Sequence, residues 1–189
     1  MSAATTVMVE RAAAPAAESR ASVRTARVGM WLALAAIGML FMAFTSSYVV
    51  RQGLDPNWRN LRMPGILIAN TFVLLASSLC LEKARRATAG LAWLLATLGL
   101  GVLFVTGQFT AWRQLGAQGV YLSTSSFGSF FYLLTAAHGL HLMGGMMALA
   151  ATAAVSSARR LRWLEVTALY WHFMGALWLY LLLLMFGLR

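Results

Sequence analysis

The sequence predicts an all-α integral membrane protein, a bundle of five transmembrane helices. Of its 189 residues, 60% are hydrophobic and only 11% are charged. A water-soluble domain of this size carries roughly 25% charged residues. Several long apolar runs meet or nearly meet the ~20 residues that a helix needs to cross a bilayer. These runs cover residues 28–50, 65–81, 91–111, 127–155 and 166–187.

The first 27 residues precede this transmembrane domain, which we place at residues 28–189. They are rich in Ala, Ser, Thr and Arg without apolar periodicity, which predicts a disordered basic tail. Glu10 and Glu18 argue against a transit peptide. The run 28–50 that follows is too long for the core of a cleaved signal peptide, so we expect it to be the first spanning helix.

The run 65–81 follows Pro64 and is the shortest, and the run 91–111 is separated from it by a basic connection. The run 127–155 contains no charged residue but carries His138 and His141, which share one helix face because they are three residues apart. Gly144, Gly145 and Ala148 follow, and such a small face predicts close approach of another backbone. The last run begins after Glu165.

Basic residues are unevenly divided between the two sides of the membrane. The tail, the connection 83–90 and the connection 156–165 carry ten of the fifteen Lys and Arg residues. Because cytoplasmic loops are enriched in Lys and Arg, this predicts a cytoplasmic N-terminus and a periplasmic C-terminus. In so apolar a chain the net charge of +10 serves topology and lipid headgroups, and we expect no nucleic-acid partner.

Aromatic and polar side chains have expected places in such a bundle. We expect interface-anchoring tryptophans near the helix ends at Trp58, Trp93, Trp112, Trp163 and Trp171. We expect helix–helix hydrogen bonds from the intramembrane groups Tyr48, Asn70, Gln108, Tyr132 and Thr135. Asp55-Pro56-Asn57 predicts a turn in the first external loop.

The histidines are the ionisable residues placed within the spans, and such residues are functional candidates. His138 and His141 lie on one helix face and cannot clamp a single haem, and His172 lies at a different expected depth. We therefore expect hydrogen-bonded neutral histidines rather than haem or metal ligands. Glu82 and Glu165 sit at span ends beside Lys and Arg, which predicts surface ion pairs of small net value. Cys80 is the only cysteine, which excludes a site needing two thiolates.

The last two runs each carry a distinctive motif. Residues 131–141 end in HGLH and are followed by Gly144-Gly145, while residues 170–173 read YWHF, with Glu165 five residues ahead. Together these motifs resemble subunit III of haem-copper oxidases. The match extends to residues 29–31, 48–51 and 107–109 and to Trp112, and it covers residues 28–187.

The resemblance implies the five-helix form of this subunit, without the two extra N-terminal helices of longer members. It implies a chain with no catalytic residue, metal or cofactor of its own, since haem and copper reside in partner subunits. The expected partners are subunit I by direct contact, subunit II and a small subunit IV. The implied role is to hold phospholipids in a cleft between the first two helices and the rest, and to support proton uptake and durability during turnover, in the bacterial inner membrane.

The resemblance also suggests site residues. Arg159 and Arg160 match basic residues that meet lipid phosphates, for which the guanidinium fork is suited. The full set of lipid-binding or interhelical candidates is His138, His141, His172, Glu165, Arg159 and Arg160. Two family acids are missing, one near Ile37 and one at Gly175, so a structural and lipid-binding role is expected rather than proton buffering.

Other functions remain open on the sequence alone. Two keep the fold and change the complex: subunit III of a quinol oxidase, or the subunit-III-like protein of a nitric oxide reductase. A free-standing haem b protein with two histidine ligands, or a small transporter, would belong to a different class. A haem protein requires its own Soret band, and a transporter would favour charged groups at the midplane, which the predicted spans lack.

Overall fold

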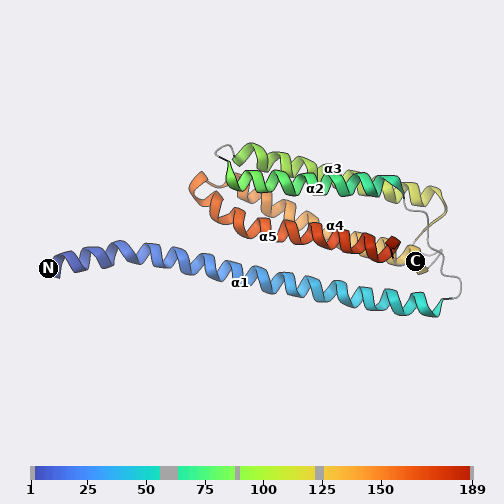
Figure 1. The fold of residues 1–189 in the computed structure, drawn as a ribbon, viewed down its shortest axis with the longest axis horizontal. Coiled ribbons are helices and arrows are strands. Elements are labelled where there is room, and N and C mark those ends of the chain that lie inside the picture. The colour runs from blue at the N-terminus through green and yellow to red at the C-terminus, as the bar shows by residue number, and fades with distance from the viewer. Residues whose placement is uncertain (1–2, 56–63, 88–89, 122–125, 188–189) are drawn as a thin grey trace.

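The chain forms a bundle of long helices (Figure 1). The structure, a computed structural model, describes residues 3–55, 64–87, 90–121 and 126–187. The helices are α1 (Ala3–Leu54), α2 (Gly65–Arg86), α3 (Gly90–Ala117), α4 (Ser126–Ala154) and α5 (Ser157–Leu182), with a π-helical turn η1 (Leu183–Gly187) at the end. Each of the five α-helices contains a stretch long and apolar enough to cross a membrane. The predicted fold class is confirmed.

The extent of contact differs between the pairs of helices. Consecutive helices run in opposite directions, and α2 lies closely along α3 (Figure 1). Helix α5 contacts α1, α2 and α4, so it links the parts of the bundle. Among the described residues, helix α1 packs mainly along α4 and α5. The resemblance implies that the first two helices stand together apart from the others. The structure differs, because α1 and α2 pack against different helices.

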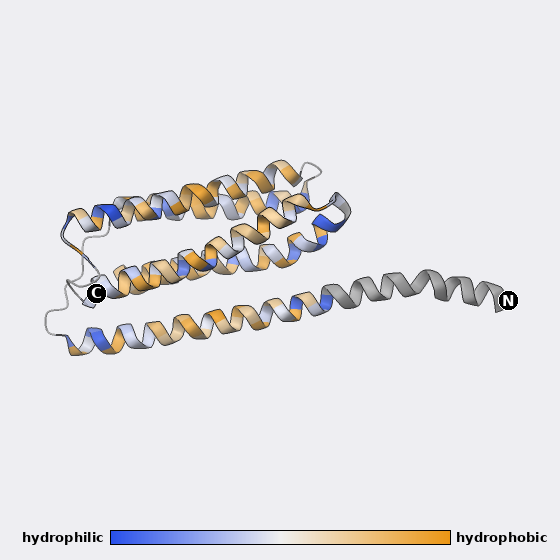
Figure 2. Cartoon of the chain, turned by 180° about the vertical axis from the view of Figure 1, so that it is seen from behind, coloured by the Kyte–Doolittle hydropathy of each residue, from blue (hydrophilic) through white to orange (hydrophobic). Residues whose placement is uncertain are grey.

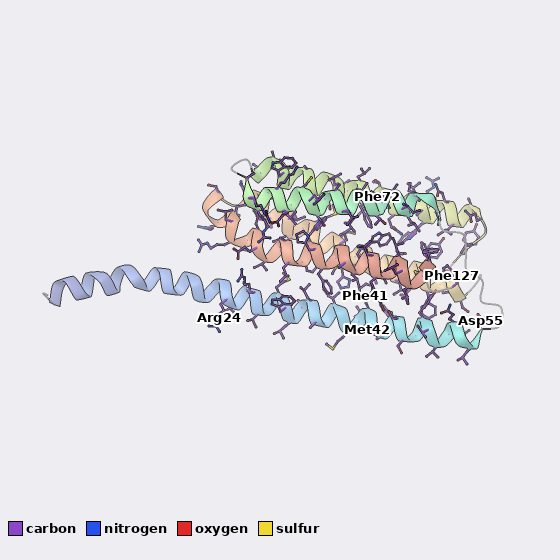
Figure 3. The ribbon with its side chains drawn as sticks, viewed as in Figure 1. Arg24, Phe41, Met42, Asp55, Phe72 and Phe127 are labelled. Carbon is purple, nitrogen blue, oxygen red and sulfur yellow. The ribbon has the colours of Figure 1, made fainter. Side chains whose placement is uncertain are left out.

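The apolar surface of α1 is mostly left to the membrane. Phe41 lies between α1 and the rest of the bundle and is fully buried, whereas Met42 points away from it (Figure 3). In the view of Figure 2, apolar colouring runs along much of the length of the helices, and the most hydrophilic residues lie mainly toward their ends. In lipid such exposure has no solvation cost, so packing and interhelical hydrogen bonds decide how helices associate.

The ends of several helices differ from the predicted runs. Helix α2 continues through Lys83 to Arg86, and α5 already begins at Ser157, within the connection predicted for 156–165. The apolar runs mark the hydrocarbon layer, whereas helical hydrogen bonding continues into the charged residues beyond it. Just after the C-terminal end of α3, Gly119 adopts a φ of 77° and the Val120 N–H donates to the Leu115 carbonyl at 3.1 Å. This left-handed glycine closes the helix.

The segment predicted as a disordered tail continues helix α1 back to Ala3 (Figure 1). It extends past the bundle, where no neighbouring helix lies beside it (Figure 1). A helical segment without tertiary packing is only marginally stable in water, so disorder of this tail stays a prediction. Trp58 and the predicted turn residues Pro56 and Asn57 lie outside the described residues.

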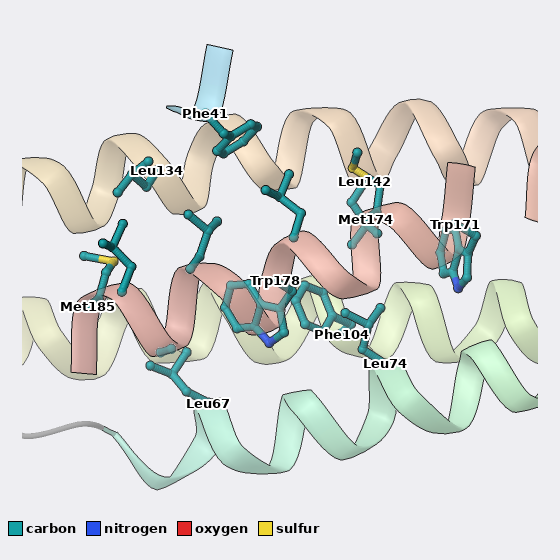
Figure 4. Close-up of a cluster of buried hydrophobic side chains, with 14 of the residues drawn as sticks. Phe41, Leu67, Leu74, Phe104, Leu134, Leu142, Trp171, Met174, Trp178 and Met185 are labelled. Carbon is teal, nitrogen blue, oxygen red and sulfur yellow. The ribbon is translucent and has the colours of Figure 1, made fainter. Parts of the chain in front are cut away.

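The core is built around two tryptophans of α5. Trp171 and Trp178 are fully buried, and Phe104 of α3 meets the Trp178 ring edge-on at 5.0 Å between centroids (Figure 4). The prediction that Trp171 anchors the membrane interface is wrong. A helix end estimated from hydropathy placed it too near the surface, whereas α5 starts nine residues before the last run and carries Trp171 into the bundle. Trp163, at 54% exposure, remains at the surface as predicted.

Candidate functional site

One end of the bundle collects most of the basic residues. The start of the bundled part of α1, the end of α2 and the start of α5 meet there (Figure 1). These segments carry Arg24, Arg27, Lys83, Arg85, Arg86, Arg159, Arg160 and Arg162. We call this region the basic end. It contains three of the six candidate site residues, Glu165, Arg159 and Arg160.

A groove of about 440 Å³ lies at the basic end between α1, α4 and α5. Its walls combine guanidinium groups with apolar side chains. The lining residues are Ala26, Met30, Ala148, Arg159, Arg162, Trp163, Val166 and Thr167. Such a site offers charge at its mouth and hydrocarbon contact along its walls, which suits an amphiphile with an anionic head.

An ion pair joins α1 to α5 beside this groove. The Arg27 Nη2 donates to Glu165 Oε2 at 2.7 Å, and both side chains are about half exposed. The sequence predicts an ion pair of Glu165 with basic residues at its end of the span, and the structure shows one with Arg27 of α1. Glu82 follows the expectation, since its carboxylate accepts from Arg85 and Arg86 within α2. Glu165 is therefore an interhelical residue.

Arg160 holds the turn between α4 and α5. Its Nη2 donates to the carbonyls of Ala153 at 3.1 Å and Val155 at 3.0 Å. The last carbonyls of a helix lack partners within it, so a guanidinium at this point satisfies them. Arg159 lines the groove, whereas Arg160 is engaged with the backbone. The two neighbouring arginines thus occupy different environments.

His138 is enclosed in the middle of the bundle. Its side chain is 1% exposed, and its ring lies 5.4 Å from the Trp178 ring and 6.2 Å from the Phe104 ring, between centroids. Neither ring nitrogen has a hydrogen-bond partner among the described residues. The expected hydrogen bond of this histidine is therefore not found there.

His141 is engaged with its own helix and with α1. Its Nδ1 lies 2.8 Å from the Ala137 carbonyl, which can only accept, so Nδ1 carries the proton. Its ring meets Phe41 of α1 edge-on, at 5.8 Å between centroids. The backbone carbonyl of His141 accepts from the Tyr170 hydroxyl at 2.8 Å. The interhelical interpretation of this residue fits these contacts.

His172 lies on the other side of α5. It lines a pocket of about 250 Å³ between α2 and α5, together with Ser78 and Gly175. The three histidines thus face three different neighbourhoods and do not converge. Within the described ranges no group of three or more His, Cys, Asp or Glu residues could hold a metal ion.

Gly144 and Gly145 of α4 leave room for side chains of α5, not for a closely approaching backbone. A Cβ at Gly145 would lie 2.9 Å from Cε1 of Tyr170 and 3.4 Å from Cε3 of Trp171. The small face of α4 therefore receives two aromatic rings of α5. The sequence placed a close contact here correctly, but the kind of contact was not foreseen.

A comparison of the sequence with known families decides the identity of this bundle. The family described as cytochrome c oxidase subunit III matches residues 8–188. The chain belongs to this family. The match covers all five helices, and it agrees with the resemblance found in the HGLH and YWHF motifs.

Curated relatives support the assignment to cytochrome c oxidase subunit III. "Cytochrome c oxidase subunit 3" of Synechocystis sp. is 29% identical over 177 residues, which cover 84% of this chain and 73% of the relative. "Probable cytochrome c oxidase subunit 3" of Nocardia farcinica is 30% identical over 159 residues, covering 75% and 77%. "Cytochrome bo(3) ubiquinol oxidase subunit 3" of Pseudomonas aeruginosa is 28% identical over 166 residues, covering 80% and 79%.

The chain is therefore a subunit III of the haem-copper oxidases, and so part of an oxidoreductase complex. With its five apolar helices it is a multi-pass protein of the bacterial plasma membrane. Sequence reasoning missed Arg27 and Tyr170 as partners of candidate residues. The position of Arg27 at the start of a span does not indicate which residue it pairs with. Tyr170 enters the sequence analysis only as part of the YWHF motif.

Proposed function

We propose that this subunit III is a non-catalytic, lipid-binding subunit that packs on subunit I of a haem-copper terminal oxidase. Haem and copper reside in the partner subunits, and subunit II and a small subunit IV complete the complex. The observation that carries the lipid-binding role is the groove at the basic end, where Arg159 and Arg162 stand over apolar walls from α1, α4 and α5. A phospholipid fits it with its phosphate at the arginines and an acyl chain beside Met30 and Trp163.

The location of the groove differs from the cleft that the resemblance implies. It lies between α1 and the pair α4–α5, because α2 is engaged with α3 and α5. The basic end is the cytoplasmic end in this proposal, since Lys and Arg concentrate there. The bound lipid then belongs to the inner leaflet.

The role in proton uptake is indirect in this proposal. Among the described residues, Glu82 and Glu165 lie at the basic end, where both carboxylates are ion-paired. The positions where the family carries acids hold Ile37 and Gly175. The subunit therefore supports subunit I through packing and lipid, and its loss should shorten the enzyme's working life during turnover more than it lowers the initial rate.

The test uses the oxidase complex purified in mild detergent, with phospholipid quantified per complex by mass spectrometry. We expect the double variant Arg159→Ala, Arg162→Ala to retain less phospholipid than the wild type. Arg86→Ala is the matched control, because it removes an arginine from the same end but outside the groove. An unchanged lipid content in the double variant contradicts the lipid-binding role.

The same purification tests the partners and the electron donor. A copurifying chain with a reduced-haem spectrum establishes subunit I, and recovery of the chain alone contradicts the packing proposed. We propose cytochrome c as the donor, because relatives from Synechocystis and Nocardia bear the name cytochrome c oxidase. Faster oxidation of a quinol than of cytochrome c favours the quinol oxidase alternative, and nitric oxide consumption favours the reductase.

A further inference from the structure

A further cavity lies away from the groove and from the pocket beside His172, in the interface between α3 and α4. It has a volume of about 270 Å³ and is lined largely by aromatic and aliphatic side chains. Phe109, Leu140 and Met143 form its outer rim, since each is more than half exposed. Gln108 and His138 form its inner floor.

The two floor residues carry unsatisfied polar atoms. Both amide atoms of Gln108 and both ring nitrogens of His138 are buried and lack hydrogen-bond partners in the part of the chain that the structure describes. The side chains are 7% and 1% exposed. Unpaired polar groups are costly in a hydrocarbon environment, so a partner is expected for them.

The packing register places these two side chains at one level. The Trp112 Nε1 donates to Thr135 Oγ1 at 3.1 Å, which pairs these positions of the antiparallel helices α3 and α4. One turn back along α3 leads to Gln108, and one turn on along α4 leads to His138. Phe104, one further turn back along α3, also contacts the His138 ring.

The polar atoms of the two floor residues are occluded as they stand, although both residues line the cavity. Contact between these atoms and the cavity therefore requires rotation of the side chains. A half-turn of the imidazole about χ2 exchanges nitrogen with carbon positions without changing the ring's shape. Rotation of the Gln108 side chain turns its amide to the same space.

We propose that the floor of this cavity binds water, one or two molecules that bridge His138 and Gln108. One water occupies about 30 Å³ of liquid volume, so the cavity has room for it. A buried water forms about three hydrogen bonds, and the imidazole and the amide supply both donors and acceptors. The apolar rim separates this water from the lipid chains.

The experiment is a cryo-EM map of the intact oxidase complex, at a resolution that shows ordered water within the bundle. We expect a compact density peak within hydrogen-bond distance of both His138 and Gln108, and its loss in the variant Gln108→Leu. A direct bond between the two side chains overturns the proposal. So does an elongated density, which would show a lipid-soluble ligand, or a side chain from another subunit in the cavity.

A stability measurement gives an independent readout on the same complex. The variants are Gln108→Leu, His138→Phe and the double variant, with Gln114→Leu as control because Gln114 is exposed on the same helix. Removing one side of a shared water leaves the other side unpaired, so the double variant should lose no more thermal stability than the worse single variant. Additive losses overturn the bridge. The control should match the wild type.

Discussion

The indole Nε1 of Trp171 donates a hydrogen bond to the Ser77 hydroxyl at 3.0 Å, across the interface of α5 and α2, with both side chains fully buried. A second bond of the same kind runs from the Trp178 Nε1 to Thr71 Oγ1 at 3.1 Å. Ser77 and Thr71 in turn donate to carbonyls of their own helix. Helix α5 is thus fastened to α2 at two levels by indole–hydroxyl pairs.

Loss of the indole N–H should weaken this attachment. Trp171→Phe removes the bond to Ser77 and part of the ring volume, so we expect destabilisation of at least about 1 kcal/mol. The check is the thermal midpoint of the purified complex. Trp31→Phe is the control, because Trp31 is exposed on α1 and is not among the residues that line the groove. Equal midpoints for the two variants would show that the Trp171–Ser77 bond contributes nothing.

Gly107 is predicted to tolerate no side chain. A Cβ added there would collide with the amide of Asn70, which donates to the Phe104 carbonyl at 3.3 Å. We therefore expect Gly107→Ala to displace the Asn70 amide, to break its bond to the Phe104 carbonyl and to lower the thermal midpoint. Gly99→Ala on the same helix meets no atom within 4 Å and should be neutral or slightly stabilising.

A second variant tests whether the loss of stability in Gly107→Ala comes from the collision with Asn70 or from a change in helix α3 itself. Adding Asn70→Ala to Gly107→Ala removes the colliding amide along with its hydrogen bond. The double variant should recover part of the lost midpoint. No recovery would mean that the space at Gly107 is not what limits this position.

Substitution of Arg159 and of Arg160 should affect the stability of the complex differently. Arg160→Ala leaves the carbonyls of Ala153 and Val155 without their donor, so it should lower the thermal midpoint of the complex by the equivalent of about 1–3 kcal/mol. Arg159→Ala should leave the midpoint nearly unchanged, because its side chain lines the groove. Equal losses of stability in both variants would refute the distinction.

The ion pair between Arg27 and Glu165 should contribute little. Half-exposed pairs are screened by solvent, and their typical value is about 0–1 kcal/mol. Glu165→Gln should therefore change the thermal midpoint only slightly, and less still at high salt. A large, salt-independent loss would indicate that the pair is desolvated in the assembled complex.

The orientation of the bundle can be tested by fusions. The excess of basic residues predicts that the basic end is cytoplasmic and the C-terminus periplasmic. Alkaline phosphatase fused to the C-terminus should be active, because it folds only after export, and a fluorescent protein fused there should stay dark. The reverse pattern would contradict the positive-inside assignment for this chain.

The number and position of the spanning helices followed from the sequence because hydropathy reports directly on the lipid environment. Their pairing did not. Nothing in the apolar run 28–50 shows that α1 will contact α4 and α5 and leave α2 to α3, since every apolar face is compatible with lipid as well as with a neighbour.

The candidate site was predictable only in its residue types. Asn70, Tyr132 and Thr135 form the interhelical hydrogen bonds expected of them, but Gln108 does not among the described residues. A polar residue within a span indicates that a partner is needed, and its identity depends on helix register. Trp171 was misplaced for a related reason, since a tryptophan suits an interface and a core equally well.

The meeting of Asn70 and Gly107 also constrains how this family can diverge. The amide of one helix occupies the space that a side chain of the other would need, so neither position can enlarge alone. Relatives with a side chain at the position of Gly107 should have a smaller residue at the position of Asn70, and with it another way to satisfy the Phe104 carbonyl. The two positions should therefore change together across lineages, while Gly99, eight residues earlier on the same helix, is free to vary by itself.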